Sequence, residues 1–263
     1  MHRPFEAGST ETLHQVQRRN LLRCAALALS CAGLLGVLLA LVETGWGPLV
    51  RFDRAWVEPL HGFARQHSAW TASMQTLADI GGTVTMRVLL GLAAGWLWIQ
   101  GARMLAVWAA AEALIGWALG AAEQTAVDRP RPHFADPVAH AAVGGSFPSG
   151  HAMASAITCG ALLALLWPRA NRTGRSVAAT LAALAVLAVG WTRIALGVHW
   201  PSDVLGGWLS AGLVLGGVTV AIELWRPGAL LRDIRRIDWR TRPRVQRVLA
   251  GEGTDAKAPG DDS

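Results

Sequence analysis

The sequence predicts an all-α membrane protein: a six-helix transmembrane bundle with an amphipathic helix at the outer-face interface. Composition is the first observation that supports this fold class. Hydrophobic residues make up 52% of the chain and charged residues only 16%, whereas a soluble domain carries about a quarter charged residues. The mean hydropathy is also positive, at +0.33. Finally, the apolar runs are long and unbroken, and lipid-embedded backbone must satisfy its own hydrogen bonds, which favours helices over barrel strands.

Six apolar runs are candidates for membrane-spanning helices. The first contains no charged residue from Ala25 to Val42, which is close to the length that crosses a hydrocarbon core. That run is long for a cleaved signal peptide and lacks a small-residue cleavage site after it, so we expect an uncleaved first helix. The six predicted spans are residues 25–42, 83–99, 104–122, 151–167, 177–194 and 204–225.

The segment between the first two spans, from Phe52 to Ile80, is mixed in character. Its large apolar residues include Trp56, Leu60, Phe63, Trp70 and Met74. Because these alternate with polar residues, the segment suits one or two amphipathic helices at the membrane interface, with tryptophans at headgroup depth.

Arginines concentrate in the segments that share one side of the predicted bundle. They are Arg18, Arg19, Arg23, Arg103, Arg169, Arg172, Arg175, Arg226, Arg232, Arg235, Arg236, Arg240, Arg242, Arg244 and Arg247. Loops on the other side are mixed in sign, so the positive-inside rule places both termini in the cytoplasm, with the chain in the inner (plasma) membrane. Residues 124–150 and the loop around His199 then lie on the outer face.

This topology divides the chain into three parts. We expect residues 1–20 to form a cytoplasmic N-terminal segment and residues 21–225 to form the membrane domain. Residues 226–263 form a basic cytoplasmic tail with a disordered end. The formal net charge of +6 comes mostly from cytoplasmic arginines. It indicates the lipid bilayer as a partner and not nucleic acid, and it leaves the oligomeric state open.

Polar residues gather in three stretches that the predicted topology places at one outer level. These stretches are EQTAVDRPRPHF at residues 123–134, FPSGH at residues 147–151 and TRIALGVHWPSD at residues 192–203. Because polar residues are few in this chain, we expect the three stretches to converge on one site.

Four of these residues are suited to binding an anion. Arg131 and Arg193 carry planar, permanently charged guanidinium groups that match phosphate oxygens. Ser149 and Gly150 lie at the start of a predicted helix, where free N–H groups and the helix dipole favour negative charge. Together they predict a phosphate site that needs no metal ion and no other cofactor.

Three further residues could carry the chemistry. His199 and Asp203 are four positions apart, which allows the carboxylate to hold one ring nitrogen and leaves the other as a nucleophile. His151 could protonate a leaving oxygen. A nucleophile, an orienting carboxylate and a general acid beside an anion site describe phosphoryl transfer.

The motifs resemble the signature of the type 2 phosphatidic acid phosphatase superfamily, which shares its site with vanadium haloperoxidases. That signature has three blocks: Lys-x6-Arg-Pro, Pro-Ser-Gly-His and Ser-Arg-x5-His-x3-Asp. Here the first block keeps Arg131 and Pro132, the second is complete at residues 148–151, and the third extends from Thr192 to Asp203. The resemblance covers roughly residues 50–225.

The resemblance implies a metal-independent membrane phosphatase that hydrolyses a lipid phosphomonoester or an isoprenoid pyrophosphate at the outer leaflet. His199 would attack phosphorus to form a phosphohistidine, with Asp203 fixing its tautomer and His151 protonating the leaving group. The groups implied to bind phosphate oxygens are Arg131, Arg193, Ser149 and the Gly150 amide. The implied substrates include undecaprenyl pyrophosphate, phosphatidic acid and phosphatidylglycerol phosphate.

Two positions depart from the signature. Thr192 replaces the serine and keeps a hydroxyl group. Gln124 stands in the lysine position and brings hydrogen-bond donors without a charge, so it is a weak candidate for phosphate binding. Arg129 lies nearby and is a second weak candidate for that role.

These departures leave alternatives open. One is a catalytically weak or inactive pseudoenzyme that binds lipid phosphate. Another is a transporter, for which Arg87 and Glu112 would be intramembrane charges along a pathway, unless they pair with each other or reach water. A third is a metal-dependent hydrolase whose ligands would be His133, His140, His151 and His199, although their spacing matches no familiar ligand set.

Overall fold

The computed structural model describes residues 7–139 and 144–237. Across this part of the chain every regular element is an α-helix, so the predicted all-α class is confirmed. The helices are α1 (Ala7–Glu43), α2 (Gly47–Gln66), α3 (Ser68–Ile80), α4 (Thr83–Ile99), α5 (Arg103–Val127), α6 (Gly150–Leu166), α7 (Arg172–Ala195), α8 (Pro201–Trp225) and α9 (Ala229–Ile237). The expected disordered end of the tail lies outside the described residues.

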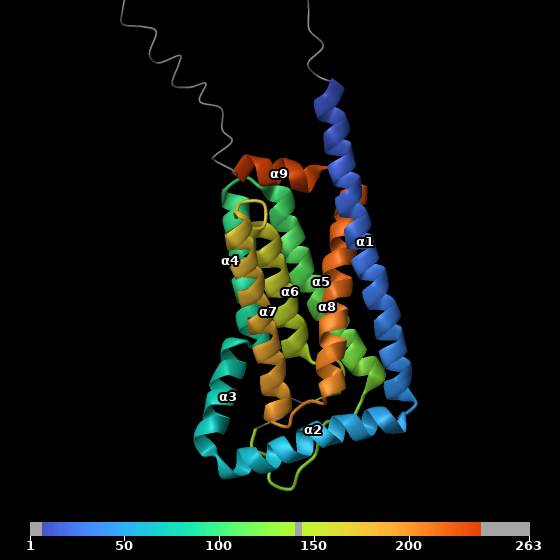
Figure 1. The fold of residues 1–263 in the computed structure, drawn as a ribbon, viewed down its shortest axis with the longest axis vertical. Coiled ribbons are helices and arrows are strands. Elements are labelled where there is room, and N and C mark those ends of the chain that lie inside the picture. Colours follow the sequence, from blue (N-terminus) through green and yellow to red (C-terminus); the bar gives the residue numbers. More distant parts are fainter. Residues whose placement is uncertain (1–6, 140–143, 238–263) are drawn as a thin grey trace, which may run out of the picture.

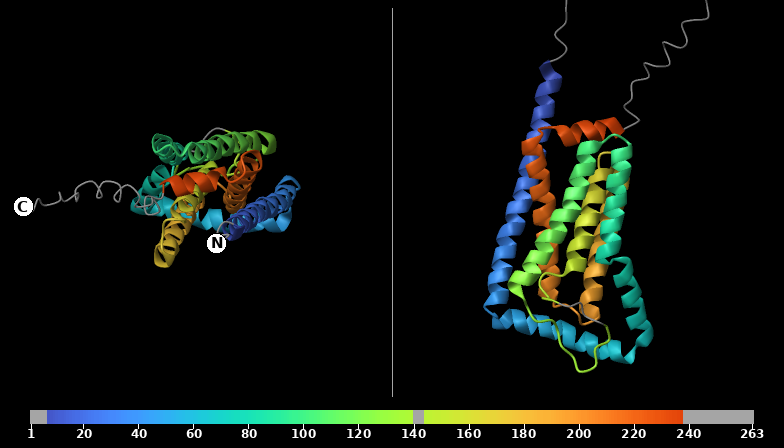
Figure 2. Two further views of the ribbon diagram at one scale, coloured as in Figure 1. Left: turned by 90° about the horizontal axis from the view of Figure 1, so that it is seen from above. Right: turned by 180° about the vertical axis from the view of Figure 1, so that it is seen from behind.

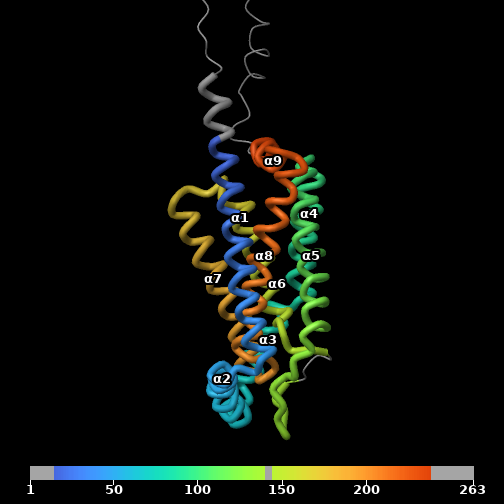
Figure 3. The backbone as a smooth tube through the Cα atoms, turned by 90° about the vertical axis from the view of Figure 1, so that its right-hand side faces the viewer, coloured from blue at the N-terminus to red at the C-terminus, as the bar shows by residue number. Residues whose placement is uncertain are grey.

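The long helices run side by side, and shorter helices cover the two ends of the bundle (Figure 1). Helix α2 lies across one end, which is called the α2 end below, and α9 lies across the other. Helix α3 returns from α2 toward the start of α4, as the view from behind also shows (Figure 2). Seen from the side, α1 and α8 lie next to each other along most of their length (Figure 3).

Within the residues that the structure describes, five helical segments are long and apolar enough to cross a membrane, which supports a multi-pass membrane protein. They are Gln15–Glu43, Ser68–Ile99, Arg103–Val127, Arg172–Ala195 and Pro201–Trp225. Helix α6 is a shorter apolar helix of 17 residues, so the count of six spans stays a prediction.

Helix α4 has the predicted bounds and α6 is shifted by one residue, whereas α1, α5, α7 and α8 extend beyond the apolar runs from which they were predicted. Helix α5 continues to Val127 and ends where Asp128 takes a left-handed conformation with φ 41°. Helix α8 begins at Pro201, whose ring is compatible with the first helical position. Where a helix ends depends on such capping conformations and not on hydropathy. The apolar runs therefore predicted α5 and α8 to be shorter than they are.

The interfacial segment forms two helices, α2 and α3, which agrees with one of the predicted arrangements. The buried face of α2 carries Asp53, Val57, His61 and Ala64, at helical spacing. This face turns toward the bundle, so α2 presents a carboxylate to the ends of the long helices. Its position at the outer membrane interface stays a prediction.

Small residues allow α1 and α8 to approach closely. A Cβ atom added at Gly216 of α8 would lie 2.6 Å from the backbone oxygen of Cys24 and 3.0 Å from the nitrogen of Ala28. Helices in lipid gain stability from close packing, and glycine permits it. The α1–α8 contact therefore depends on the absence of a side chain at Gly216.

Glycines also allow close contact between the start of α8 and the loop before α6. The ring of Phe147 occupies the space where Gly206 would carry a Cβ atom, and the backbone oxygen of Ser149 lies 2.6 Å from the Cβ position of Gly207. The amide of Ser149 donates a hydrogen bond to the carbonyl of Asp203 at 2.9 Å. The backbone of the FPSGH motif at residues 147–151 therefore packs directly against the backbone at the start of α8, where the third motif ends.

A pair of adjacent glycines tests the α1–α8 contact. Gly216→Ala should lower the thermal midpoint of the detergent-solubilised protein, because overpacking a closely packed contact costs about 1–3 kcal/mol. Gly217→Ala is the matched control, since nothing lies within 4 Å of its Cβ position. It should leave the midpoint unchanged or raise it, because alanine favours a helix over glycine by roughly 0.5–1 kcal/mol. Equal midpoints for the two variants would contradict the packing argument.

Candidate active site

The three polar stretches come together at the α2 end of the bundle. His151 lies in the first turn of α6, Arg193 in the last turn of α7 and Asp203 in the first turn of α8. His199 lies in the turn between α7 and α8, and Arg131 lies in the loop that follows α5. Segments far apart in the chain therefore place cations, imidazoles and a carboxylate side by side.

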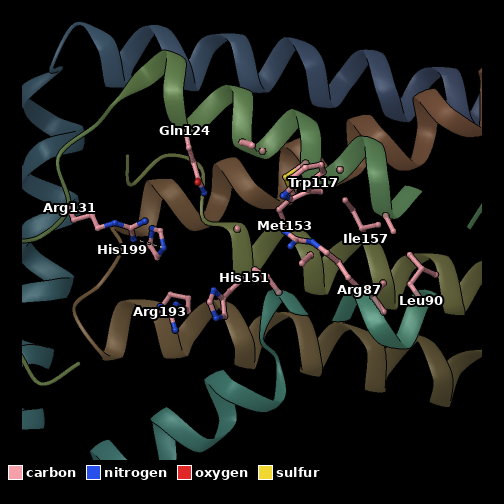
Figure 4. A pocket seen from close by; sticks show the side chains of 18 residues that line it. Arg87, Leu90, Trp117, Gln124, Arg131, His151, Met153, Ile157, Arg193 and His199 are labelled. Carbon is pink, nitrogen blue, oxygen red and sulfur yellow. Dashed lines mark hydrogen bonds between the residues drawn. The ribbon is translucent and has the colours of Figure 1, made fainter. Parts of the chain in front are cut away.

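These side chains border a cavity of about 220 Å³. Its lining residues are Thr83, Arg87, Leu90, Ala113, Gly116, Trp117, Gly120, Ala121, Gln124, Arg131, Gly150, His151, Met153, Ala154, Ile157, Thr158, Arg193 and His199. Polar groups gather toward the α2 end and apolar groups continue between α4, α5 and α6 (Figure 4). The cavity thus suits a molecule with an anionic head and an apolar body.

The ring of His199 is oriented by partners on both nitrogens. Its Nδ1 lies 2.8 Å from the carbonyl oxygen of Ser146 and 3.5 Å from a carboxylate oxygen of Asp203. Because a carbonyl only accepts, Nδ1 carries the proton and Nε2 keeps its lone pair. Nη1 of Arg131 lies 2.9 Å from that Nε2 and can donate to it.

Burial favours the neutral form of His199. The side chain is almost fully enclosed, and this desolvation lowers the pKa of His199, while hydrogen bonding and the charge of Asp203 oppose the shift. The arginines Arg131 and Arg193 lower the pKa further. A neutral imidazole with a free Nε2 lone pair is the form in which histidine acts as a nucleophile.

Arg131 is fixed by backbone carbonyls. Its guanidinium donates to the carbonyl oxygens of Gly144, Gly145 and Val198 at 3.1–3.2 Å. Burial lowers the pKa of Arg131 and the charge of Asp203 opposes that shift, but an arginine remains protonated. The result is a positioned cation whose Nη1 faces the unprotonated Nε2 of His199.

Two other predicted phosphate-binding residues carry buried polar atoms without partners. In the described part of the chain, Nε of Arg193 and Oγ of Ser149 are buried and make no hydrogen bond. Arg193 lines the cavity, whereas at the start of α6 the lining residues are Gly150 and His151 and not Ser149. Such atoms are uncommon in folded proteins, and an anion in the cavity would give the Arg193 guanidinium a partner.

Gln124, near the C-terminal end of α5, lines the cavity, and its side chain lies next to the start of α6. Its Nε2 donates to the carbonyl of Pro148 at 3.0 Å, and the same atom is 3.5 Å from the Cβ position of Gly150. The amide group in the family's lysine position therefore reaches the helix start that was predicted to bind an anion.

Arg129 does not line the cavity. Its guanidinium forms ion pairs with Asp203 at 2.5 Å and with Asp53 at 2.8 Å, and it donates to Oγ of Ser202 at 2.7 Å. The Asp53 and Asp203 side chains are 1% and 0% exposed, respectively. We therefore assign Arg129 to positioning Asp203 and not to the weak phosphate-binding role considered from sequence.

Asp53 of α2 is a member of this network that sequence reasoning missed. Besides the ion pair, it accepts hydrogen bonds from the backbone amide and the hydroxyl of Ser202, at 3.0 and 2.6 Å. The signal available in the sequence was an acidic residue on the apolar face of an amphipathic helix, four positions before Val57. Such a residue requires a buried partner, which here comes from α8 and the loop after α5.

The two intramembrane charges considered for transport are separated. Arg87 lines the cavity, whereas Glu112 is fully buried in α5 and does not line it. Among the described residues, no ion pair joins them, and neither carboxylate oxygen of Glu112 has a hydrogen-bond partner. They do not pair, and this arrangement gives the transporter alternative no support.

The metal-dependent alternative also gains no support. The part of the chain that the structure describes contains no group of three His, Cys, Asp or Glu side chains that could hold a metal ion. His133 is exposed in the loop after α5, and His140 lies outside the described residues. Metal independence stays a prediction.

Comparison with known proteins supports the resemblance carried by the three motifs. The family model of the PAP2 superfamily matches residues 100–227, which include all three motifs. A solved structure of a transmembrane PAP2-type phosphatidylglycerolphosphate phosphatase from Bacillus subtilis is similar in fold, with a TM-score of 0.58 at 22% identity. The match covers 76% of this chain and 98% of the other. The predicted family resemblance is thus confirmed.

Two curated relatives from Escherichia coli (strain K12) match a shorter part of the chain. The putative undecaprenyl-diphosphatase YbjG is 40% identical over 87 residues, which is 33% of this chain and 38% of that protein. Phosphatidylglycerophosphatase B is 38% identical over 84 residues, which is 31% of this chain and 29% of that protein. Less than half of either relative is therefore matched.

The Asp53–Arg129–Asp203 network can be tested through stability. Asp53→Ala should destabilise the protein by roughly 3–5 kcal/mol, because it removes one partner of a buried ion pair. Asp53→Asn keeps hydrogen-bonding groups near Ser202 but loses the charge. Its thermal stability should lie between that of Asp53→Ala and that of the parent. Thermal unfolding in one detergent measures all three proteins.

The control is Glu58→Ala, which removes an exposed carboxylate from the same helix. It should shift stability by less than about 0.5 kcal/mol. If Asp53→Ala lowered stability no more than Glu58→Ala does, the network would not hold α2 against the site.

Proposed function

Residues 100–227 of this chain match the family model of the PAP2 superfamily, and on that premise we propose that the protein is a membrane phosphatase of lipid phosphates. Its substrate is a lipid phosphomonoester or an isoprenoid pyrophosphate, and the reaction passes through a phosphohistidine. One observation carries the proposal: the Nε2 lone pair of neutral His199 faces Arg131 inside a cavity that continues into the apolar interior.

In the first step the substrate phosphate enters between Arg131 and Arg193. Arg131 turns the N–H group that faces His199 toward a phosphate oxygen, which frees Nε2. That nitrogen forms a bond to phosphorus while the bond from phosphorus to the leaving oxygen breaks. His151 donates a proton to the leaving oxygen.

In the second step water replaces the histidine. His151, now neutral, accepts a proton from water as the water oxygen bonds to phosphorus, and the bond from phosphorus to Nε2 breaks. Inorganic phosphate leaves and His199 regains its neutral form. The arginines and the Gly150 amide stabilise the charge on the phosphate oxygens in both transition states, which is a role for fixed donors and not for a metal.

The orientation of His199 supports this role. The Ser146 carbonyl holds the Nδ1 proton at 2.8 Å, and the Asp203 carboxylate at 3.5 Å stabilises the positive ring that forms during attack. Asp203 is itself held by Arg129. The nucleophile therefore loses little conformational entropy when the substrate binds.

The relatives' names support the substrate class. One is named for undecaprenyl diphosphate and the other for phosphatidylglycerophosphate, and both substrates join a phosphate head to a long apolar body. The arginine distribution favours a site at the outer leaflet of the inner membrane, with both termini in the cytoplasm.

The loss expected from glutamine at position 124 is too small to turn the enzyme into an inactive pseudoenzyme. A charge-assisted hydrogen bond is worth roughly 1.5–3 kcal/mol against about 1 kcal/mol for a neutral one. Replacing lysine by glutamine therefore removes on the order of 1–2 kcal/mol, or about a five- to thirtyfold change in rate. The nucleophile, its carboxylate and the general acid are all retained.

His199→Ala should reduce phosphate release by at least about a thousandfold, because the nucleophile is lost. Phosphoenzyme trapped by acid quench from a labelled lipid phosphate should disappear with it. The assay contains EDTA, in which the parent should remain active, and vanadate should inhibit it as a mimic of five-coordinate phosphorus.

His133→Ala is the matched control, because that histidine is exposed and outside the cavity. It should keep both activity and trapped phosphoenzyme. If the activity of His199→Ala were within a few-fold of that of the parent, His199 would not be the nucleophile. If the parent required an added divalent ion for activity, the metal-dependent hypothesis would be favoured instead.

Sidedness is tested by cysteine labelling of intact cells. The parent for this test has Cys24, Cys31 and Cys159 replaced, and single cysteines are introduced as Ala135→Cys in the loop after α5 and Thr173→Cys near the start of α7. Both positions are exposed. A membrane-impermeant maleimide should label position 135 and spare position 173, because the arginine-rich end faces the cytoplasm. The reverse pattern would place the site on the cytoplasmic side.

A further inference from the structure

The cavity extends beyond the groups that the proposed reaction uses. Thr83 of α4 is level with the start of α6, since its methyl carbon lies 3.6 Å from the Cβ position of Gly150. Further in, the hydroxyl of Thr158 donates to the carbonyl of Met86 at 3.1 Å. The two helices therefore run in the same direction, and Arg87 lies about one helical turn, roughly 6 Å, inward from the phosphate site.

Arg87 lines the cavity as an intramembrane cation. Among the described residues, no carboxylate forms an ion pair with it and no hydrogen bond from its guanidinium is found. A charged side chain within a membrane span is costly unless it has a partner or reaches water. Because helical side chains lean toward the helix N-terminus, Arg87 extends toward the α2 end, in the direction of His151 (Figure 4).

The order of groups along the cavity determines what Arg87 meets. Arg131 and His199 lie at the α2 end, and His151 comes next. Arg87 follows, and beyond it the lining becomes apolar at Leu90 and Ile157. A lipid whose terminal phosphate contacts His199 and whose body lies among the apolar residues has its leaving group beside Arg87.

Charge distinguishes two kinds of leaving group at this position. A phosphomonoester leaves a neutral alcohol, which gives Arg87 no anionic partner. A diphosphate leaves a lipid phosphate, whose negative charge would offset the desolvation of the guanidinium. The permanently charged side chains among the described lining residues are all arginines, namely Arg87, Arg131 and Arg193, which suits the extra charge of a diphosphate.

We propose that Arg87 is a specificity-determining residue that binds the second phosphate of a lipid diphosphate and so favours diphosphate over monoester substrates. The inference rests on the proposed phosphatase function. Arg87 pairs with the phosphate that remains on the lipid, while Arg131 and Arg193 bind the phosphate that is transferred to His199. Since the leaving lipid phosphate gains negative charge as that bond breaks, whereas the alcohol of a monoester leaves neutral, Arg87 acts on the transition state of the diphosphate as well as on its binding.

The test compares two substrates in the same mixed micelles: a long-chain isoprenyl diphosphate and phosphatidic acid. Arg87→Gln should lower kcat/KM for the diphosphate by roughly 10- to 100-fold, the range for loss of a charge-assisted contact. For phosphatidic acid it should change kcat/KM by less than about threefold. Arg87→Lys keeps the charge but loses the planar fork, and should recover part of the diphosphate activity.

A non-hydrolysable methylene diphosphonate lipid adds a readout without turnover. Its Kd should rise in Arg87→Gln, whereas the Kd of a monophosphonate lipid should not. Arg103→Gln is the matched control, because this arginine is exposed at the opposite end of α5 and lies outside the cavity. It should leave the ratio of the two kcat/KM values unchanged.

Three results would overturn the inference: equal losses on both substrates, no loss on either, or a parent that hydrolyses phosphatidic acid but not the diphosphate. A parent that releases phosphate from neither lipid would instead overturn the proposed function. In that event, selective loss of diphosphonate binding in Arg87→Gln would still support Arg87 as a second-phosphate ligand.

Discussion

The ion pairs of Arg129 with Asp53 and Asp203 join three parts of the chain, and the geometry of the rest of the site depends on these ion pairs. Arg129 belongs to the loop after α5, Asp53 to the helix across the end of the bundle, and Asp203 to the first turn of α8. Both carboxylates are buried, so losing the guanidinium would leave two uncompensated charges. This penalty holds α2, the loop and the start of α8 in one arrangement.

That arrangement separates the arginines of the site by role. Arg129 neutralises carboxylates and is thereby withdrawn from the cavity. Arg131 and Arg193 line the cavity, and within residues 7–139 and 144–237 no carboxylate forms an ion pair with either of them. An anion-binding site requires cations that are not paired with carboxylates. A buried carboxylate that orients a histidine, in contrast, requires a cation paired with it. With Asp203 compensated by Arg129, the charge of Asp203 does not draw Arg131 away from the proposed position of the phosphate.

Close packing of small residues gives the site its shape. The loop before α6 meets α8 at Gly206 and Gly207, where side chains would collide with Phe147 and the Ser149 backbone. On the other side of α6, a Cβ atom at Gly116 of α5 would meet Ile157 at 2.3 Å. Such contacts fix the rotation of each helix, and helix rotation decides which side chains line the cavity.

The sequence by itself determined the all-α class, the apolar helices and the three motifs, because hydropathy, helical period and motif spacing are local properties of the chain. Tertiary structure alone decided the pairing of Asp53 with Arg129, which joins residues 76 positions apart, and the separation of Arg87 from Glu112. Periodicity identifies the face of a helix that is apolar, but the partner of a polar residue on that face depends on how distant helices pack. Arg129 and Arg131 are chemically identical and two positions apart, and only packing assigns one to a carboxylate and the other to the cavity.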